Sequence, residues 1–469
     1  MSRLIVVSNR VPVPEKGKAA PAGGLAVALQ AALKERGGIW MGWSGKSSGE
    51  EETPQIKTII DGKITYALTD LTDRDVEEYY HGFANRVLWP TFHYRIDLAE
   101  YGRKEMSGYF RVNRFFAQRL APLLKPDDVI WVQDYHLIPL ASELRKMGIK
   151  NRIGFFLHIP LPPADVLLAM PVYDQIIEGL AQYDLVGFQT DYDLANFVGA
   201  LVREGIGETL EDGYFKSHNR IFKTGAYPIS IETAAFAAYA KRAVNNAMVK
   251  KAASSIIGHD LVIGVDRLDY SKGIPQRLDA YERFILANPA YQGNVSYLQV
   301  TPKSRSEVPE YEAMQRQLAE QAGRVNGELG TVDWVPIRYM TRSVARPILA
   351  GLYRLAKVGL VTPMRDGMNL VAKEYIAAQD PDDPGVLILS RFAGAARELK
   401  SALLVNPYDT EGVANAIARA LSMPLEERKE RWQKMMDHLL VHDVTEWCNN
   451  FMDDLTHVPQ EGDHAALLT

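Results

Sequence analysis

The stretch VGLVTPMRDGMNLVAKE, residues 358–374, contains a complete strand–turn–helix unit and indicates the fold class. Its first part, Val358–Val361, is a continuous apolar run, which is typical of a parallel strand buried on both faces. A polar turn follows, and Gly367 in this turn permits a tight bend. The helical pattern begins after the turn. A strand that leads through a short turn into a helix is the repeating unit of doubly wound α/β proteins.

Apolar runs of the same kind recur along the chain, and amphipathic segments separate them. The other candidate strands are Leu4–Val7, Val129–Val132, Ile153–Leu157, Leu185–Phe188, Leu261–Val265, Val295–Val300 and Val386–Leu389. Helical patterns lie between the runs, for example at Leu25–Leu33, Pro139–Lys146 and Arg277–Ala287. This alternation predicts α/β domains with parallel sheets.

Two sheets are expected, because the candidate strands are too many for one compact domain and 469 residues suffice for two or three domains. We predict a first domain at 1–235 and a second at 236–455. The boundary lies at an Ala- and Lys-rich helical segment, Ala234–Ala253, which gives way to a new strand. Residues 459–469 have no apolar pattern, and we predict a disordered tail there.

The composition is that of a globular enzyme, with 47% hydrophobic and 24% charged residues. The formal net charge of −5, from 53 basic and 58 acidic residues, argues against nucleic acid as the main partner but allows a local phosphate pocket. The single cysteine, Cys448, forms no internal disulfide and no zinc pattern. The apolar run Leu4–Val7 is too short for a signal peptide, and no run reaches the length of a membrane span. We therefore expect a cytoplasmic protein with no membrane partner.

Polar and cationic residues follow the strands in both halves of the chain. Ligands of open α/β sheets bind beyond the carboxyl ends of the strands. The segments at these ends are Ser8–Arg10, Gln133–His136, His158–Pro160, Asp266–Gly273, Thr301–Arg305 and Thr362–Asn369. Their position predicts a ligand-binding cleft between the two domains.

Arg267 and Lys272 flank a loop that follows a strand. Two cations held in this way neutralise the charge that develops on a diphosphate leaving group. The alternative is that both are surface cations paired with Asp266 and Asp269. The spacing alone leaves both interpretations open.

The turn Asp366–Leu370 offers backbone amides to a hydroxyl or a phosphate, and Glu374 in the next helix can accept hydrogen bonds from a ribose diol. The alternative makes Asp366 a helix cap and Glu374 a residue favoured by the helix dipole. Gly23 and Gly24 precede another helix, where a phosphate or a plain turn fits equally well. Neither a nicotinamide fingerprint nor a P-loop is present.

Asp191-Tyr192-Asp193 has the spacing of a metal–nucleotide carboxylate pair. It follows Thr190 and opens an amphipathic segment, so we interpret it as the start of a helix. No other cluster has metal-ligand spacing, and we expect no metal. His158 follows a buried strand, and it is either a site residue or a core histidine with satisfied hydrogen bonds.

Ten motifs together resemble one family, the trehalose-6-phosphate synthases, which are glucosyltransferases of the two-domain GT-B fold. They occur in order between about residue 3 and residue 455: VSNRVPV (7–13), AGGLAVAL (22–29), WMGWSG (40–45), VLWPTFHYR (87–95), WVQDYHLIPL (131–140), RIGFFLHIPLP (152–162), YDLVGFQT (183–190), DRLDYSKGIPQR (266–277), VGLVTPMRDGMNLVAKEYIAAQ (358–379) and SRFAGAARELKSALLVNPYD (390–409). Each motif is modest alone, whereas ten in order are specific.

The resemblance implies two Rossmann-like domains that face a central cleft, with a C-terminal helix around Glu426–Leu455 that crosses back to the first domain. It implies donor-binding roles for Gly23, Gly24, Arg267, Lys272, Val344, Asp366, Gly367, Met368, Asn369, Leu370 and Glu374. Val344 departs from relatives that carry a bulkier residue there. The implied acceptor-binding residues are Arg10, Trp40, Tyr80, Trp89, Asp134 and Arg305. Catalytic roles fall on Arg267, Lys272, His158 and Asp366.

The implied reaction moves glucose from UDP-glucose to glucose 6-phosphate with retention and without a metal or another cofactor. A double displacement needs a carboxylate nucleophile, and the sequence nominates none, so we expect attack on the face from which the diphosphate leaves. The sequence leaves open ADP- or GDP-glucose as donor, a related solute such as glucosylglycerol phosphate as product, and a non-catalytic sugar-phosphate sensor. It also leaves a homo-oligomer open. No phosphatase domain follows, so we expect a separate phosphatase to act on the product.

Overall fold

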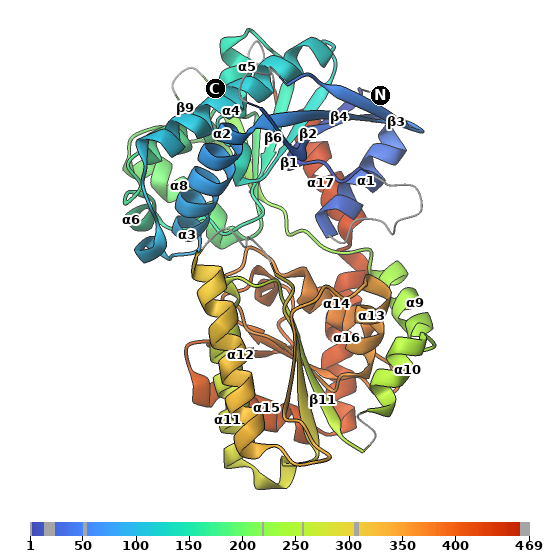
Figure 1. The fold of residues 1–469 in the computed structure, drawn as a ribbon. Coiled ribbons are helices and arrows are strands. Elements are labelled where there is room, and N and C mark those ends of the chain that lie inside the picture. Colours follow the sequence, from blue (N-terminus) through green and yellow to red (C-terminus); the bar gives the residue numbers. More distant parts are fainter. Residues whose placement is uncertain are drawn as a thin grey trace. The chain divides into compact units, whose positions relative to one another are not determined.

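The computed structural model describes residues 2–13, 24–49, 54–217, 220–255, 258–303 and 309–459. The contacts divide the chain into two compact units (Figure 1): unit 1 comprises Met1–Pro228 with Trp447–Thr469, and unit 2 comprises Ile229–Glu446. The predicted domain boundary at 235 lies seven residues later than the contact boundary at 228. The reason is that Ile229 and Thr233 already bond within unit 2. Lys373 Nζ donates to Ile229 O (2.8 Å), and Thr233 Oγ1 donates to Leu439 O (2.7 Å).

Unit 1 is built on a ten-stranded sheet in the order β3-β4-β2-β1-β5-β6-β7-β10-β9-β8. The strands from β4 to β10 in this order are parallel, whereas β3, β9 and β8 run antiparallel to their neighbours. The strands are β1 Leu4–Arg10, β2 Gly38–Ser48, β3 Lys57–Asp61, β4 Ile64–Thr72, β5 Val129–Gln133, β6 Arg152–Phe156, β7 Leu185–Phe188, β8 Glu208–Thr209, β9 Tyr214–Ser217 and β10 Arg220–Ala226.

The helices of unit 1 include a wide π-type segment, η1, in which the N–H of Trp89 donates to the carbonyl of Ala84 five residues earlier. The helices are α1 Gly24–Arg36, α2 Asp73–Asp75, η1 Val76–Leu88, α3 Trp89–Phe92, η2 Ile96–Leu98, α4 Arg103–Leu120, η3 Ala121–Leu123, η4 Tyr135–Leu137, α5 Leu140–Lys146, α6 Ala164–Leu167, α7 Tyr173–Leu180, α8 Asp191–Arg203 and α17 Val444–His457. No helix in the described ranges is long and apolar enough to cross a bilayer.

Unit 2 has a six-stranded, fully parallel sheet in the order β13-β12-β11-β14-β15-β16. Counted from the first strand of this unit, the order is that of the dinucleotide-binding Rossmann fold. The strands are β11 Asp260–Val265, β12 Val295–Val300, β13 Ile337–Met340, β14 Val358–Val361, β15 Val386–Ser390 and β16 Leu403–Val405. The eight predicted strands are all confirmed, and they form the central parts of both sheets.

Helices cover both faces of the second sheet, with α11, α12 and α15 on one side and α9, α10, α13, α14 and α16 on the other (Figure 1). The helices are α9 Thr233–Ala243, α10 Ala247–Ser254, η5 Tyr270–Lys272, α11 Ile274–Ala287, η6 Pro289–Tyr291, α12 Pro309–Leu329, α13 Arg346–Leu355, α14 Leu370–Ala378, η7 Gly394–Arg397, α15 Thr410–Ser422 and α16 Leu425–Val441.

Two predicted helices are each divided in two. The predicted segment Ala234–Ala253 breaks before α10, where Asn246 caps the new helix by accepting a hydrogen bond from Met248 N (2.9 Å). The predicted helix Glu426–Leu455 breaks between α16 and α17, where Asp443 Oδ1 accepts from Thr445 N and Glu446 N. Asn and Asp side chains compete for backbone N–H groups in this way and so start new helices.

Helix α17 packs directly on the sheet of unit 1, although it is more than 200 residues away from that sheet in the sequence (Figure 1). The Phe451 ring stacks on Trp131 of β5, with centroids 4.7 Å apart. Glycines on β6 and β7, the next two strands in the sheet order, make room for this ring. A Cβ at Gly154 or at Gly187 would lie 2.9 Å or 2.7 Å from Phe451. The close approach explains why β6 and β7 carry a glycine at these positions.

We predict that Phe451→Ala lowers the free energy of unfolding of unit 1 by about 3–5 kcal/mol, because it leaves a cavity against Trp131. The measurement is a urea titration followed by tryptophan fluorescence. Asp453→Ala is the matched control, since Asp453 lies on the same helix with an exposed side chain. Equal unfolding free energies for the two variants would contradict the packing described for α17.

Candidate functional site

A buried guanidinium organises the strand ends of unit 2. Arg277 of α11 is 1% exposed. Its Nη1 donates to Asp266 Oδ2 (2.6 Å) and to Gln299 Oε1 (3.2 Å). Its Nε donates to Thr362 Oγ1 (3.0 Å), and its Nη2 donates to the carbonyl of Lys272 (3.1 Å). These partners stand at the ends of β11, β12 and β14, so one side chain ties three strands and the loop that carries Lys272.

The two predicted cations of this loop have separate carboxylate partners. Lys272 Nζ lies 2.6 Å from Asp366 Oδ2. Arg267 Nη2 lies 3.0 Å from Asp269 Oδ2, and the Arg267 side chain is 35% exposed. The sequence offered Asp266 and Asp269 as partners of the two cations, and Arg267 does pair with Asp269. The Lys272 ammonium contacts Asp366 instead, and Asp266 is bound to Arg277.

The turn after β14 folds around Asp366. Asn369 Nδ2 donates to Asp366 Oδ2 (3.0 Å), which is also the oxygen that contacts Lys272. The N-cap of α14 is Asn369 and not Asp366: the Asn369 side chain accepts from Ala372 N (3.3 Å), and its backbone has a positive φ of 77°. The alternative that made Asp366 the helix cap is therefore wrong. The carboxylate faces Lys272 in front of the helix.

The segment η7 forms backbone hydrogen bonds with this turn. Gly394 N donates to Asp366 O (3.1 Å), and Ala395 N donates to Met368 O (2.8 Å). A Cβ at Gly394 would lie 1.9 Å from Gly367 O, so only glycine allows the two backbones to approach this closely. The backbone amides at the start of α14, including that of Leu370, are thereby held in place. Helix N-termini of this kind bind anions.

Glu374 lies one turn into α14, next to the first residue of α13. Its Oε1 is 3.7 Å from Arg346 Nη2, and its side chain is 17% exposed. Burial raises the pKa of Glu374 to about 7, and Arg346 partly opposes this rise. Val344 precedes α13 by two residues and is half-buried. The carboxyl group thus changes its charge close to neutral pH.

Lys373 forms a buried ion pair that the sequence interpretation did not assign. It is fully buried and contacts Glu398 Oε2 at 2.7 Å. Glu398 in turn contacts His438 Nε2 of α16 at 3.1 Å. Through Glu398, the residue that follows η7, Lys373 connects α14 with α16. Lys373 also donates to the carbonyl of Ile229, the first residue of unit 2.

In unit 1, Asp134 and His158 are in direct contact beyond β5 and β6. Asp134 Oδ1 accepts from His158 N (3.2 Å), and Asp134 N donates to Phe156 O (2.8 Å). These bonds hold Asp134 at a positive φ of 73°, a conformation that costs a non-glycine residue on the order of 1–3 kcal/mol. Strain of this kind is concentrated at functional sites.

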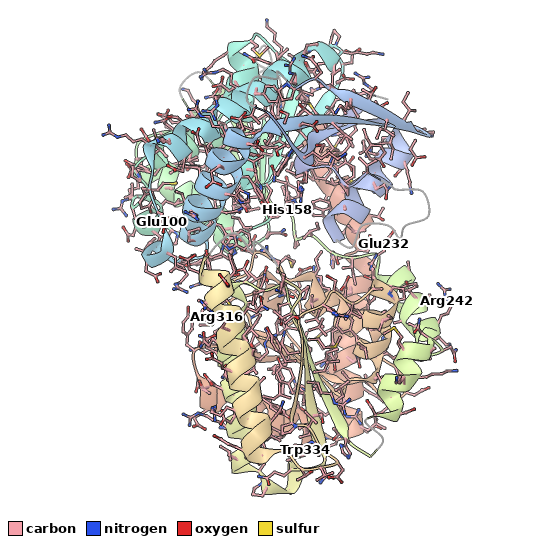
Figure 2. All side chains as sticks on the ribbon, in the orientation of Figure 1. Glu100, His158, Glu232, Arg242, Arg316 and Trp334 are labelled. Atoms are coloured by element: carbon pink, nitrogen blue, oxygen red, sulfur yellow. The ribbon has the colours of Figure 1, made fainter. Side chains whose placement is uncertain are left out.

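His158, labelled in Figure 2, has an amide partner at each nitrogen of its imidazole ring. Its Nε2 contacts Gln133 Oε1 (2.9 Å), and Gln189 Nε2 contacts its Nδ1 (3.4 Å). These amide partners fit the tautomer that carries its proton on Nε2. Burial lowers the pKa of His158 to about 3, so the ring carries no charge near neutral pH. The satisfied hydrogen bonds agree with a core histidine, and the role of His158 in the site stays a prediction.

A series of aromatic rings connects the predicted acceptor residues of unit 1. The Arg10 guanidinium lies 4.8 Å from the Trp43 ring, and Trp43 meets Tyr80 edge-on at 5.4 Å. The series then continues through two rings next to Asp134 to reach Trp89. The successive centroid distances are 5.9 Å for Tyr80–His136, 3.9 Å for His136–Tyr135 and 5.8 Å for Tyr135–Trp89. Arg10, Tyr80 and Trp89, far apart in sequence, thus lie along one continuous set of contacts, and Asp134 directly precedes two of its rings in the chain.

Trp40 lies outside this series. It is 2% exposed, donates to Ser8 Oγ (2.8 Å) and stacks on Tyr66 at 6.3 Å. Trp40 and Trp43 are three residues apart on β2 and so point to opposite faces of the sheet. This packing places Trp40 in the core of unit 1, and Trp43 is the tryptophan that contacts Arg10.

The other predicted site residues lie at helix starts or outside the described residues. Gly24 is the first residue of α1, so this helix begins one residue earlier than predicted, whereas Gly23 and Arg305 lie outside the described residues. Asp191 opens α8, and Thr190 caps it by accepting from Asp193 N (3.2 Å), which confirms the helix start. Within the part of the chain that the structure describes, no group of three or more His, Cys, Asp or Glu side chains is arranged to hold a metal ion.

The whole chain is similar to known glycosyltransferases. The model of the family described as Glycosyltransferase family 20 matches residues 2–457. A protein of Sinorhizobium fredii (strain NBRC 101917 / NGR234), named trehalose-6-phosphate synthase, is 74% identical over 457 residues, which cover 97% of this chain and 98% of that protein.

Solved structures give the same result. One is a UDP-forming α,α-trehalose-phosphate synthase from Burkholderia xenovorans in complex with glucose-6-phosphate. It has a TM-score of 0.93 and 48% identity, over 97% of this chain and 100% of that chain. Another, from E. coli, is bound with UDP-2-fluoro glucose. It has a TM-score of 0.92 and 46% identity, over 98% of this chain and 100% of that chain.

Proposed function

The chain belongs to glycosyltransferase family 20, and on that basis we propose how its residues carry out the family's reaction. The protein is a UDP-forming α,α-trehalose-phosphate synthase with two Rossmann-like domains of the GT-B fold. It transfers glucose from UDP-glucose to glucose 6-phosphate and releases trehalose 6-phosphate and UDP. One observation carries the assignment: a trehalose-6-phosphate synthase is 74% identical over nearly the whole length of both chains.

The donor diphosphate is assigned to Arg267, Lys272 and the amides at the start of α14. Lys272 Nζ has three N–H donors, so it can keep its contact with Asp366 and still bind a phosphate oxygen. The predicted donor residues Gly23, Gly24, Gly367, Met368, Asn369 and Leu370 are retained in this role, with Val344 near the nucleoside. Glu374 is assigned to the ribose hydroxyls, because a carboxylate accepts two hydrogen bonds.

The acceptor is assigned to the aromatic series of unit 1. Arg10 at one end supplies a charged donor to the sugar phosphate, and Arg305 is proposed as its partner. Tyr80 and Trp89 supply ring surfaces, and Asp134 accepts hydrogen bonds from sugar hydroxyls. The contacts of Arg10 with Trp43 and of Trp43 with Tyr80 support this grouping.

The chemical step is attack on the face from which UDP departs. The anomeric hydroxyl of glucose 6-phosphate forms the new C–O bond as the bond from the donor carbon to the diphosphate breaks. The departing phosphate oxygen takes the hydroxyl proton. Arg267 and Lys272 neutralise the charge that develops on the diphosphate, and this preorganised stabilisation is the main contribution of the protein. His158, which is neutral, helps to position the sugars and does not donate a proton as an imidazolium.

We assign the positive charge at the diphosphate to these two side chains and expect no metal requirement. The proposed location is the cytoplasm. The single cysteine, Cys448, supports a reducing compartment, because it is buried in unit 1 and has no cysteine partner in the chain.

The function is tested by a matrix of donors (UDP-, ADP- and GDP-glucose) against acceptors (glucose 6-phosphate and glycerol 3-phosphate), read by nucleoside diphosphate release. We expect the greatest release with UDP-glucose and glucose 6-phosphate, and the same rate with excess EDTA. A preference for glycerol 3-phosphate would indicate a synthase of glucosylglycerol phosphate. The absence of turnover with every pair would indicate a sugar-phosphate sensor. Loss of activity in EDTA with rescue by Mg²⁺ or Mn²⁺ would contradict metal independence.

We predict that Lys272→Ala lowers kcat by on the order of 10²–10³ while the protein stays folded, because it removes a charge whose interaction strengthens as the diphosphate departs. Arg267→Lys should also lower kcat, since an ammonium cannot reproduce a planar fork. Lys357→Ala is the matched control. Lys357 also pairs with an aspartate, Asp260, but at the opposite ends of the strands. Near-normal kcat in folded Lys272→Ala would refute the assignment.

We further predict that UDP-glucose binding weakens as the pH falls through about 7, by up to about tenfold per pH unit, because protonated Glu374 loses its charge as an acceptor. Calorimetric titration with UDP-glucose alone avoids the titrating phosphate of the acceptor. Glu374→Gln has the same shape and no titration, so its affinity should be low and independent of pH over this range. A variant that keeps the pH dependence of the unmodified protein would exclude Glu374 as its source.

A further inference from the structure

The strand β3 is an exposed edge of the unit 1 sheet. It is the terminal strand of the sheet order, and only β4 pairs with it among the described strands. All five of its residues, Lys57–Asp61, are exposed. They include two large apolar side chains, Ile59 at 44% and Ile60 at 76% exposure. An edge with unpaired backbone groups and exposed isoleucines is a template for pairing with another strand.

The hairpin geometry determines which backbone groups of β3 face outward. The strand pairs with β4 from Lys57↔Leu68 to Asp61↔Ile64, and Gly62-Lys63 form the two-residue turn. The pair that closes such a turn is hydrogen-bonded, and hydrogen-bonded pairs then alternate along the ladder. The N–H and C=O groups of Lys57, Ile59 and Asp61 therefore face β4. Those of Thr58 and Ile60 face outward.

The outward groups fit a second copy of the same strand. In an antiparallel pair centred on Ile59, Thr58 faces Ile60 of the other copy, so both outward-facing residues of each strand form hydrogen bonds. The same register places Ile59 opposite Ile59. It also places Lys57 opposite Asp61 at both ends. A shifted register would place Thr58 opposite Thr58, or Ile60 opposite Ile60. Either shift loses one of the two hydrogen-bonded pairs and both pairs of Lys57 with Asp61.

We propose that β3 is a self-association surface, where two copies of this chain pair their β3 strands antiparallel about a twofold axis. The interface is isologous, because the same five residues contribute on both sides. Its occupant is a second copy and not an unrelated strand, since the charge pattern of the strand is complementary to itself. Lys57 can join this pairing, because its contact with Asp70 (3.2 Å) leaves its side chain 73% exposed.

The test uses two charge variants of the full chain. Asp61→Lys leaves two lysines on the strand, and Lys57→Asp leaves two aspartates, so each variant repels itself in the proposed register. Opposite charges across two strands stabilise the pairing, and like charges destabilise it. We therefore expect the dissociation constant of each variant to rise on the order of 10- to 100-fold. An equimolar mixture of the two restores both charge pairs, and it should associate as tightly as the unmodified protein.

Analytical ultracentrifugation over a range of concentrations measures this association. Glu211→Lys and Lys150→Asp are matched controls, because they make the same changes in net charge at exposed positions away from β3. The proposal predicts association of the unmodified protein, dissociation of each β3 variant and recovery in the mixture. A monomeric unmodified protein, unchanged association of either β3 variant, or failure of the mixture to recover would each overturn it.

A backbone variant makes the test independent of charge. Thr58→Pro removes an N–H that faces outward, so the β3–β4 hairpin is kept while the pairing between copies loses a donor. We expect weaker association with unchanged glucosyl transfer. Association equal to that of the unmodified protein would show that β3 is not the contact.

Discussion

The buried guanidinium of Arg277 is the interaction on which the proposed donor site of unit 2 depends. A charge taken out of water is tolerated only when its partners satisfy it almost completely. Here the partners are Asp266, Gln299, Thr362 and the carbonyl of Lys272, which belong to the ends of three adjacent strands and to the loop beside them. Any movement of one strand end leaves a buried charge with an unfilled bond. The loop of Lys272 and the turn after β14 are therefore held in register before a ligand arrives.

Preorganisation of this kind is what the transfer reaction needs. The charge on the diphosphate grows only as the glycosidic bond breaks, so dipoles and cations that are already in place avoid the cost of reorganisation. A second buried pair, Lys373 with Glu398, holds α14, and Gly394 brings η7 against the turn. The amides of α14, the Lys272 ammonium and the Asp366 carboxylate then share one rigid support.

The proposed acceptor site of unit 1 is held by packing and not by buried charge. The rings between Arg10 and Trp89 contact one another in sequence, and Asp134 is held in a strained conformation by the backbone of Phe156 and His158. In the same unit, Phe451 of α17 fills the space above Gly154 and Gly187. The last helix of the chain is thus part of the core that supports strands from the first half.

The amino-acid sequence by itself determined the strands that are buried on both faces, because continuous runs such as Val358–Val361 show their burial directly. It also placed Lys272 and Asp366 shortly after such strands, at the edge where ligands of open α/β sheets bind, and Glu374 in the helix that follows. It did not predict β3, whose residues are exposed, or β2, where Gly42 must lie against Ser8 of the neighbouring strand. Only the tertiary structure decided that Lys272 pairs with Asp366, 94 residues away, that Arg277 binds Asp266, and that Trp43 rather than Trp40 meets Arg10. The physical reason is that periodicity shows which face of an element is apolar, whereas ion pairs, shifted pKa values and ring contacts depend on which elements become neighbours.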